Sequence, residues 1–536
     1  MTFVKCKCTL PVLLLLCTNL LFAQPGSPRS IDIRHYVFNL SVNDQNNVIE
    51  GLARIQLQAI MPIKNIELDL ASVGNDGKGM KVTSVSDGTN KLAFTHAHNN
   101  LSITIPAILK KGDSIELSIE YAGVPGDGLI ISKNRYQRKT FFADNWPIRA
   151  RSWLPCNDNP IDKATVEFNV IAPQHYQVIS NGIQVEETGL QNGMKLTRYR
   201  ETVPLPTKIM VVGIADFSNQ LIGEVDGIPV SAWVYEEDRE LADHAYGTSL
   251  DALKFMINLV GPYPYRKLAN VQSKTIFGGL ENANTIFYQE NSVDPVLNFE
   301  ATVAHEVGHQ WFGDNLTETG FEHLWLSEGF ATYLSHLFIE SKYGGDTLSK
   351  EMSIDRQKVI EYYKKAQTPV VDLDTKNYMD LLNINSYQKG SWVLHMLRYQ
   401  VGDSMFWKGI RNFYSIYAGK NASTDDLRNV METVSAQKLE RFFRQWLYTA
   451  GHPQLDISYG YTNNQLEVTI DQKQPTVFDF VLPINIVTSD QGTLTKSTRI
   501  TQRNSSFKIP LNAAPLKIIP DPNTTLLFEA KINRLN

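Results

Sequence analysis

The first part of the chain alternates apolar and polar residues in short runs, the pattern of β-strands that bury one face. Such runs lie at Tyr36–Val42, Ile115–Tyr121 and Ala164–Val170. Turns rich in Gly, Asn and Asp separate these runs, as expected for consecutive strands. The sequence therefore predicts a β-rich N-terminal domain that extends to about residue 217.

The spacing changes from about residue 218 to residue 450, where apolar residues recur at the three-and-four intervals of helices. Expected helices include Leu250–Val260, which Gly261-Pro262 ends, together with Trp392–Tyr399 and Leu439–Leu447. Alternation returns after Leu455 and predicts a small β-sandwich. The expected fold is thus a multidomain α+β arrangement, with domains at 24–217, 218–450 and 451–536.

The run V-A-H-E-V-G-H-Q-W-F at Val303–Phe312 carries candidate metal chemistry. His305 and His309 are four residues apart, so on a helix both imidazoles leave the same face and can bind one ion. Glu306 lies between them, where a carboxylate can take a proton from bound water. A solvated helix could carry the same spacing, but the apolar flanks indicate burial, which is unfavourable for these groups without a cation. The pattern is the H-E-x-x-H arrangement of zinc peptidases.

Glu328 is the expected third metal ligand, since catalytic zinc usually has three protein ligands and a water. It lies in W-L-S-E-G-F-A-T-Y at Trp325–Tyr333, and the apolar spacing that follows predicts a second helix packed against the first. Leu326 and Phe330 flank Glu328, which favours burial with a cation over a solvated position. Two His and one Glu favour Zn²⁺ and also fit cobalt or manganese.

These motifs resemble those of the aminopeptidase N family of zinc metallopeptidases, a gluzincin family that includes the leukotriene-hydrolase branch. Further matches are G-G-L-E-N at Gly278–Asn282 and Y-Q-K-G at Tyr387–Gly390, with weaker ones from Arg34-His35-Tyr36 to Gly451-His452-Pro453. The resemblance implies a saddle-like N-terminal β domain, a thermolysin-like and mainly helical catalytic domain, and a C-terminal β-sandwich. It also implies the short form of the family, without the helical C-terminal domain of many relatives.

The resemblance implies roles for the matched catalytic residues. His305, His309 and Glu328 would bind one Zn²⁺, and Glu306 would be the general base that activates a water. Tyr387 would stabilise the oxyanion of the tetrahedral intermediate. Each role suits the residue type, because a carboxylate can shuttle a proton and a hydroxyl can donate to a developing oxyanion.

The resemblance also implies substrate contacts. Glu281 would bind the free α-amine of a peptide, which makes such enzymes exopeptidases. Gly278, Gly279 and Asn282 belong to the same motif, and the two glycines would run beside the bound peptide, since glycine permits close approach of a ligand to the backbone.

One departure from the family pattern concerns the substrate amine. Trp146 stands where relatives usually carry Gln or Glu, and Asp144 lies two residues earlier. Both are candidate substrate contacts, and Trp146 would add an apolar surface near the first substrate side chain.

The N-terminus has the pattern of a secretion signal. Lys5 and Lys7 precede an apolar run at Leu10–Phe22, and Ala23 is the expected cleavage position. Three of the 4 cysteines lie in this segment, so the mature chain keeps Cys156 alone and forms no internal disulfide. No later stretch is long and apolar enough to span a membrane. The expected location is the periplasm or the exterior of a bacterial cell.

The net charge of −5 and the lack of a basic block argue against a nucleic-acid partner. The expected function is a secreted zinc aminopeptidase that hydrolyses the N-terminal bond of peptides with a free amine. Epoxide hydrolysis on the same zinc is one alternative. A non-catalytic binding protein with a vestigial site is another, which the intact Glu281, Glu306 and Tyr387 disfavour. The sequence predicts no oligomeric state.

Overall fold

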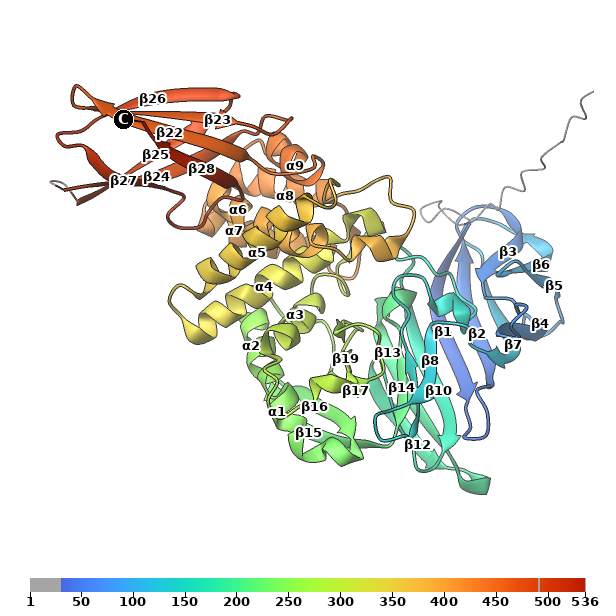
Figure 1. Cartoon of the computed structure of the whole chain (residues 1–536). Coiled ribbons are helices and arrows are strands. Elements are labelled where there is room, and N and C mark those ends of the chain that lie inside the picture. The colour runs from blue at the N-terminus through green and yellow to red at the C-terminus, as the bar shows by residue number, and fades with distance from the viewer. Residues whose placement is uncertain (1–29, 490–491, 536) are drawn as a thin grey trace, which may run out of the picture.

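The structure is a computed structural model that describes residues 30–489 and 492–535. The expected signal peptide at 1–23 lies outside these residues. Figure 1 shows a β-rich N-terminal part, a central part with the helices and a C-terminal β module, which follow one another along the molecule. Among the described helices, none is both long enough and apolar enough to cross a membrane.

The alternating runs of the N-terminal part form strands of a large sheet, as predicted. Tyr36, Phe38 and Leu40 point into its core, while their neighbours are more exposed. The central pair β1–β10 is parallel and the other neighbours pair antiparallel. The strand order is β12 (Ile183–Gly189), β13 (Met194–Leu205), β10 (Ala164–Pro173), β1 (Ile31–Ser41), β2 (Ile49–Ala59), β7 (Ser114–Val124) and β4 (Gly79–Ser86).

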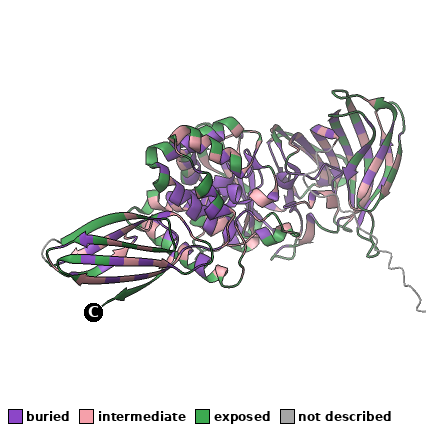
Figure 2. Cartoon of the chain, turned by 90° about the horizontal axis from the view of Figure 1, so that it is seen from above, coloured by how far each residue is buried: buried purple, intermediate pink, exposed green. Residues whose placement is uncertain are grey.

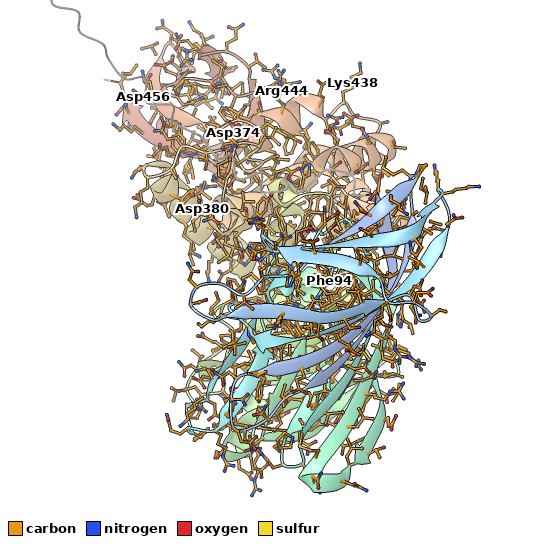
Figure 3. The ribbon with its side chains drawn as sticks, turned by 90° about the vertical axis from the view of Figure 1, so that its right-hand side faces the viewer. Phe94, Asp374, Asp380, Lys438, Arg444 and Asp456 are labelled. Carbon is orange, nitrogen blue, oxygen red and sulfur yellow. The ribbon has the colours of Figure 1, made fainter. Side chains whose placement is uncertain are left out.

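Smaller sheets complete this domain. One has the order β11 (Gln177–Ser180), β14 (Val212–Ala215), β9 (Lys139–Ala143) and β8 (Leu129–Lys133). Another has the order β3 (Ile63–Asp69), β6 (Asn100–Leu109) and β5 (Ala93–Ala97). Figure 3 looks onto this domain, with Phe94 of β5 among the strands at the front and the helical part behind.

The expectation of helical structure from residue 218 onward is wrong for the first part of the central domain. That part contains a sheet with the order β15 (Phe217–Val225), β16 (Ile228–Tyr235), β17 (Leu268–Ser273), β19 (Thr285–Gln289) and β18 (Gly279–Leu280). Every residue of β17 is buried. Such strands have no polar face, so they lack the alternation that identifies a strand in a sequence.

Helices then cover this sheet and form the body of the central domain. The helices predicted at 250–260, 392–399 and 439–447 correspond to α2, α6 and α9. The α-helices are α1 (Ala242–Tyr246), α2 (Thr248–Leu259), α3 (Glu300–His309), α4 (Trp325–Tyr343), α5 (Thr347–Tyr363), α6 (Gly390–Val401), α7 (Asp403–Tyr417), α8 (Thr424–Ser435) and α9 (Glu440–Leu447). Short elements between them are η3 (Thr207–Ile209), β20 (Thr317–Glu318), η6 (Phe321–His323), η7 (Tyr378–Leu381), the π-helical turn η8 (Asn385–Lys389) and β21 (Asn421–Ala422).

The C-terminal module is built from two sheets that share one core, as the alternation after Leu455 predicts. One has the order β26 (Asn504–Pro510), β23 (Gln465–Gln472), β22 (Gln454–Thr462) and β28 (Glu529–Arg534). The other has the order β25 (Gly492–Ile500), β24 (Phe480–Thr488) and β27 (Pro515–Pro520). Figure 2 shows the alternation of buried and exposed residues along these strands, whereas the helices of the central part are buried on their inner faces and exposed on their outer faces.

Two glycines allow α4 and α6 to approach closely. A Cβ placed on Gly329 would lie 2.9 Å from the Cα and the carbonyl carbon of Gly390, a distance that real Cβ atoms do not reach. Glu328 precedes the first glycine, and the turn η8 precedes the second. This contact therefore brings the expected metal ligand next to the turn that carries Tyr387.

We expect Gly329→Ala to destabilise the central domain by about 1–3 kcal/mol, because the added methyl group must push α4 and α6 apart. The measurement is the urea midpoint of the metal-free protein, followed by tryptophan fluorescence. Gly308→Ala in α3 is the matched control, since its Cβ would lie 3.5 Å from the Cα of Ala331, an ordinary contact. An equal loss in both variants would contradict the proposed crowding.

Candidate active site

Helix α3 brings both histidines to one side, as their spacing predicts. The Nε2 atoms of His305 and His309 are 3.0 Å apart, and the two rings are nearly perpendicular at 81°. Trp311 and Phe312, which follow the helix, are fully buried and hold its C-terminal end in the core. Two imidazole nitrogens so close together share one site.

Glu328 completes this site from the first turn of α4. Its Oε2 lies 3.2 Å from Nε2 of His305 and 3.2 Å from Nε2 of His309. Within the described residues, these three form the one group of His, Cys, Asp or Glu side chains with geometry for a metal ion. Tetrahedral zinc with bonds of about 2.0–2.2 Å separates its ligands by about 3.3–3.6 Å, slightly more than the spacing here. The donor set fits zinc.

Groups behind His309 orient its ring. Its Nδ1 lies 3.2 Å from the carbonyl oxygen of Phe312 and 3.0 Å from Oγ of Ser327. Donation from Nδ1 to that carbonyl leaves the Nε2 lone pair free for a metal. Gly313 makes room for this arrangement, since a Cβ there would lie 2.3 Å from Oγ of Ser327, and its φ of +126° suits glycine.

The charges of the site require a cation. Burial would lower the pKa of His309, but the carboxylates of Glu328, Glu281 and Glu306 together raise it to about 10. Burial opposes ionisation of Glu328 as well, and the two imidazoles nevertheless hold the pKa of Glu328 below its usual range. Either a proton or a metal ion must therefore sit among these groups, and the three converging donor atoms suit a metal.

Glu306 lies against the backbone of strand β18. A Cβ on Gly279 would lie 2.2 Å from Oε1 of Glu306, so only glycine leaves room for this carboxylate. Burial raises the pKa of Glu306 well above its ordinary value, and the neighbouring Glu281 and Glu328 raise it further. A carboxylate with a raised pKa is a stronger proton acceptor.

Glu281 follows β18 and faces the same space. Its side chain is 6% exposed, and its carbonyl accepts a hydrogen bond of 2.8 Å from Nε2 of Gln310. Burial raises its pKa, while His309 and the ammonium of Lys208 act in the opposite direction. A third cationic group, such as a substrate amine, would stabilise the charged form of this carboxylate.

Tyr387 lies in the π-helical turn η8 and stacks on the metal-site histidine. The ring centroids of Tyr387 and His305 are 5.9 Å apart, with an angle of 12° between the planes. Burial raises the pKa of Tyr387 well above its ordinary value, and the surrounding carboxylates, Glu328 foremost, raise it further. The phenol therefore keeps its proton and acts as a hydrogen-bond donor.

These residues line one cavity of about 280 Å³. Its polar wall contains the metal donors, Glu281, Glu306 and Tyr387, with the backbone of Gly278 and Gly279 beside them. Its apolar wall contains Trp146, Phe277, Leu280 and Leu382. Phe277 and Leu280 flank the Gly pair, so their place could have been inferred from the motif. Leu382 has no such signal in the sequence.

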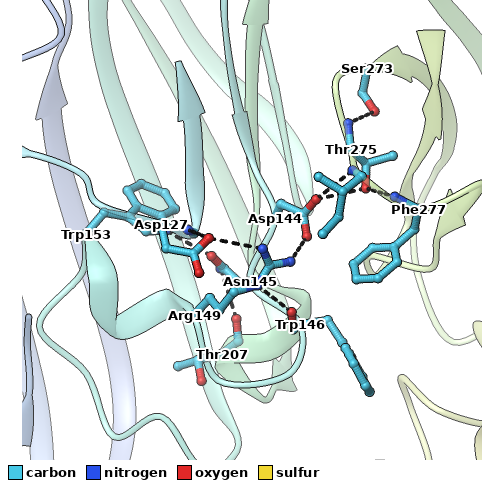
Figure 4. Close-up of polar contacts among 12 residues, drawn as sticks. Asp127, Asp144, Asn145, Trp146, Arg149, Trp153, Thr207, Ser273, Thr275 and Phe277 are labelled. Carbon is cyan, nitrogen blue, oxygen red and sulfur yellow. Dashed lines mark hydrogen bonds and ion pairs between the residues drawn. The ribbon is translucent and has the colours of Figure 1, made fainter. Parts of the chain in front are cut away.

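The structure does not bring Asn282 and Asp144 to this cavity wall. Asn282 is fully buried, and neither polar atom of its side chain has a partner among the described residues. Asp144 forms an ion pair with Arg149 and accepts hydrogen bonds from Oγ1 of Thr275 (3.0 Å) and from the backbone N–H of Ile276 (3.1 Å), as Figure 4 shows. Asp144 thus fixes the segment before Phe277 and does not line the cavity.

Trp146 does belong to the cavity wall. It is 2% exposed and packs edge-on against Phe277 (centroids 6.1 Å apart) and Phe321 of η6 (5.9 Å). Arg149, whose Nε donates to the carbonyl of Trp146 at 2.7 Å, ties this residue to the network around Asp144 (Figure 4). The N-terminal domain therefore contributes an aromatic face to a site whose metal donors lie in the central domain.

A helix pair that holds two histidines and a glutamate, with a buried carboxylate beside them, defines the class of the metallopeptidases. The sequence matches the Peptidase M1 N-terminal domain over residues 33–209 and the Peptidase family M1 domain over residues 245–446. The chain therefore belongs to peptidase family M1.

Individual relatives agree with this assignment. Aminopeptidase M1-C of Oryza sativa subsp. japonica is 25% identical, over 84% of this chain and 53% of its own length. Glutamyl aminopeptidase of Rattus norvegicus is 26% identical, over 76% of this chain and 47% of its own length. This chain thus spans about half the length of such relatives. The M1 zinc metallopeptidase structure from Deinococcus radiodurans has the same fold, with a TM-score of 0.69 at 24% identity over 81% of this chain and 96% of that one.

We expect Glu328→Ala to lower bound zinc well below one ion per chain, because it removes one of three donors. Glu306→Gln is the matched control and keeps zinc, since Glu306 is not a donor. Zinc binding by the two variants is measured as zinc content after dialysis and as the rise in melting temperature on addition of zinc. An ion that binds only the folded state raises the melting temperature, because it stabilises that state. Equal zinc content in wild type and Glu328→Ala would rule out Glu328 as a ligand.

Proposed function

We propose that the protein is a zinc aminopeptidase that hydrolyses the N-terminal peptide bond of peptides with a free α-amine. The observation that carries this proposal is the position of Glu281 in the same cavity as the metal donors and Glu306. Zinc, when bound, supplies a Lewis acid that acidifies a water and polarises the scissile carbonyl.

Glu306 and Tyr387 would perform the proton and charge steps. The Glu306 carboxylate, which lines the same cavity as the metal donors, takes a proton from the attacking water and can deliver it to the leaving amine. The Tyr387 phenol keeps its proton and donates a hydrogen bond to the oxyanion that develops on the scissile carbonyl.

Glu281 would set the register of cleavage. Its buried carboxylate pairs with the substrate ammonium and so places the first peptide bond beside the metal. The apolar wall of Trp146, Phe277 and Leu382 would face the first substrate side chain. This wall favours bulky apolar residues there, through burial worth about 25 cal/mol per Å².

The place of action follows from the N-terminal residues. The two lysines, the apolar run and Ala23 support secretion into the periplasm or the exterior of a bacterial cell. Hydrolysis of an epoxide on the same zinc stays the alternative reaction, and a lipid-epoxide assay beside the peptide assay separates the two.

We expect Glu306→Gln to lower kcat for an aminoacyl fluorogenic substrate by at least about 10²-fold, because the amide cannot accept the proton of water. Zinc content stays at the wild-type level. A chelator abolishes the wild-type rate, and added zinc restores it. Wild-type turnover in a zinc-loaded Glu306→Gln variant would overturn the proposed mechanism.

We also expect N-acetylated peptides to be cleaved poorly or not at all, because they lack the charge that pairs with Glu281. Glu281→Ala lowers the rate on free peptides and narrows the ratio between free and blocked substrates. Mass spectrometry of the products of matched free and acetylated peptides measures both. Internal cleavage of a blocked peptide at a comparable rate would indicate an endopeptidase instead.

A further inference from the structure

A buried lysine ends the turn that carries Tyr387. Lys389 is 1% exposed, and its Nζ donates a hydrogen bond of 2.9 Å to the carbonyl oxygen of Gly451. This is the one hydrogen bond that its side chain makes within the described part of the chain. Burial lowers the pKa of Lys389 to about 7, which shows how unfavourable this position is for a charge. The hydrogen bond from Lys389 to Gly451 joins the turn of Tyr387 to the start of the C-terminal module.

The acceptor is held in place by its own surroundings. Gly451 joins α9 to β22, with a φ of +91°. A Cβ there would lie 3.0 Å from Cζ of Tyr363, so the glycine backbone packs directly on that ring. The next residue, His452, is 1% exposed and contacts the same ring edge-on, with centroids 5.4 Å apart. The carbonyl that Lys389 uses therefore has a defined position.

The C-terminal module itself is fixed to the helices by contacts at another point. Arg356 of α5 forms an ion pair of 2.5 Å with Asp521 and donates a hydrogen bond of 2.8 Å to the carbonyl of Leu526. His395 of α6 lies with its Nε2 2.9 Å from the carbonyl of Thr524. These contacts fix the C-terminal module on α5 and α6, and so restrict the position of Gly451 at its start.

The other end of the turn has its own anchor. The Nδ2 of Asn385 donates to the carbonyls of Thr368 (3.0 Å) and Pro369 (3.3 Å). The backbone N–H of Lys389 closes the turn by donating to the carbonyl of Ile384 at 2.9 Å. Tyr387 thus lies between one anchor in the central domain and one at the C-terminal module.

We propose that Lys389 is a positioning residue that fixes the phenol of Tyr387 through the carbonyl of Gly451. The C-terminal module then contributes to the reaction without touching the substrate. The proposal rests on the proposed function, in which Tyr387 donates to the oxyanion. Position matters for such a donor, because a displacement of about 1 Å in an active site can reduce the rate by about 10²-fold.

A double-mutant cycle tests the proposal. Lys389→Met removes the donor with little change in volume. We expect kcat to fall about tenfold or more in zinc-loaded protein, with KM changed by less than about twofold, since the donor acts mainly on the transition state. In a Tyr387→Phe background, Lys389→Met lowers kcat no further, because the group it positions is gone. A merely structural role would reduce kcat by the same factor in both backgrounds.

Two further variants sharpen the test. Gly451→Ala displaces the acceptor instead of the donor, and we expect the same loss of kcat and the same lack of effect in the Tyr387→Phe background. Lys267→Met is the matched control, because the Nζ of Lys267 also donates to a backbone carbonyl, that of Ser180, while Lys267 lies outside the cavity wall. We expect Lys267→Met to lower stability. We also expect Tyr387→Phe to lower kcat by the same factor in the Lys267→Met protein as in the wild type.

The outcomes separate this proposal from the proposed function. Wild-type protein that cleaves no peptide would overturn the proposed function. Active wild type, an impaired Tyr387→Phe and an unimpaired Lys389→Met would overturn the positioning role alone. An unimpaired Tyr387→Phe would overturn the role of Tyr387 and with it that of Lys389. Losses that multiply across the two backgrounds would show that Lys389 acts on stability.

Discussion

Three carboxylates and two imidazoles lie together in one largely buried cavity, and a proton or a metal ion among them balances their charges. Glu306 lies on α3 with His305 and His309, and Glu328 of α4 and Glu281, which follows β18, line the same cavity. Leaving such groups buried without a partner would be strongly unfavourable. A divalent ion at the donor atoms lowers the repulsion between Glu328 and the other carboxylates. In the proposed mechanism, such an ion would leave Glu306 free to act as a base and Glu281 free to pair with an ammonium. Much of the central domain serves to hold these carboxylates and imidazoles close to one another.

Close backbone contacts at glycines allow the central domain to hold the groups of the site together. Gly279 admits the Glu306 carboxylate, Gly313 admits the hydroxyl of Ser327 behind His309, and Gly329 meets Gly390 where α4 and α6 touch. A side chain at any of these positions would displace a group that lines or supports the cavity rather than only fill a space. Glycine at these positions loses more conformational entropy on folding than other residues would. In return, it leaves room for the precise placement of another residue's side chain.

The sequence predicted the cluster of His305, His309 and Glu328, and the spacing of the two histidines follows from helical geometry alone. It also predicted the alternating strands of both β parts, where one face is buried and the other is not. It missed the sheet in the central domain, since a strand such as β17 is buried on both faces and shows no alternation. It gave no sign that Asp144 lies outside the cavity wall, because the ion pair of Asp144 with Arg149 is set by the tertiary fold.

Charged groups lie where the N-terminal domain meets the central domain, beside the apolar core that the two domains share. Lys208 of η3 pairs with Glu318 of β20, and both side chains are almost completely buried. The Nζ of Lys163 donates to the carbonyl of Asn315 at 2.7 Å. Buried ion pairs add little net stability, since desolvation offsets most of the attraction, but a displaced partner leaves an unpaired charge that is strongly unfavourable.

Such contacts therefore favour one relative orientation of the two domains, although they add little to the free energy of unfolding. That orientation matters at the cavity, where Trp146 from one domain faces the metal donors of the other. The aromatic wall and the metal site are thus parts of one cavity, which these charged contacts and the apolar core shared by both domains hold together.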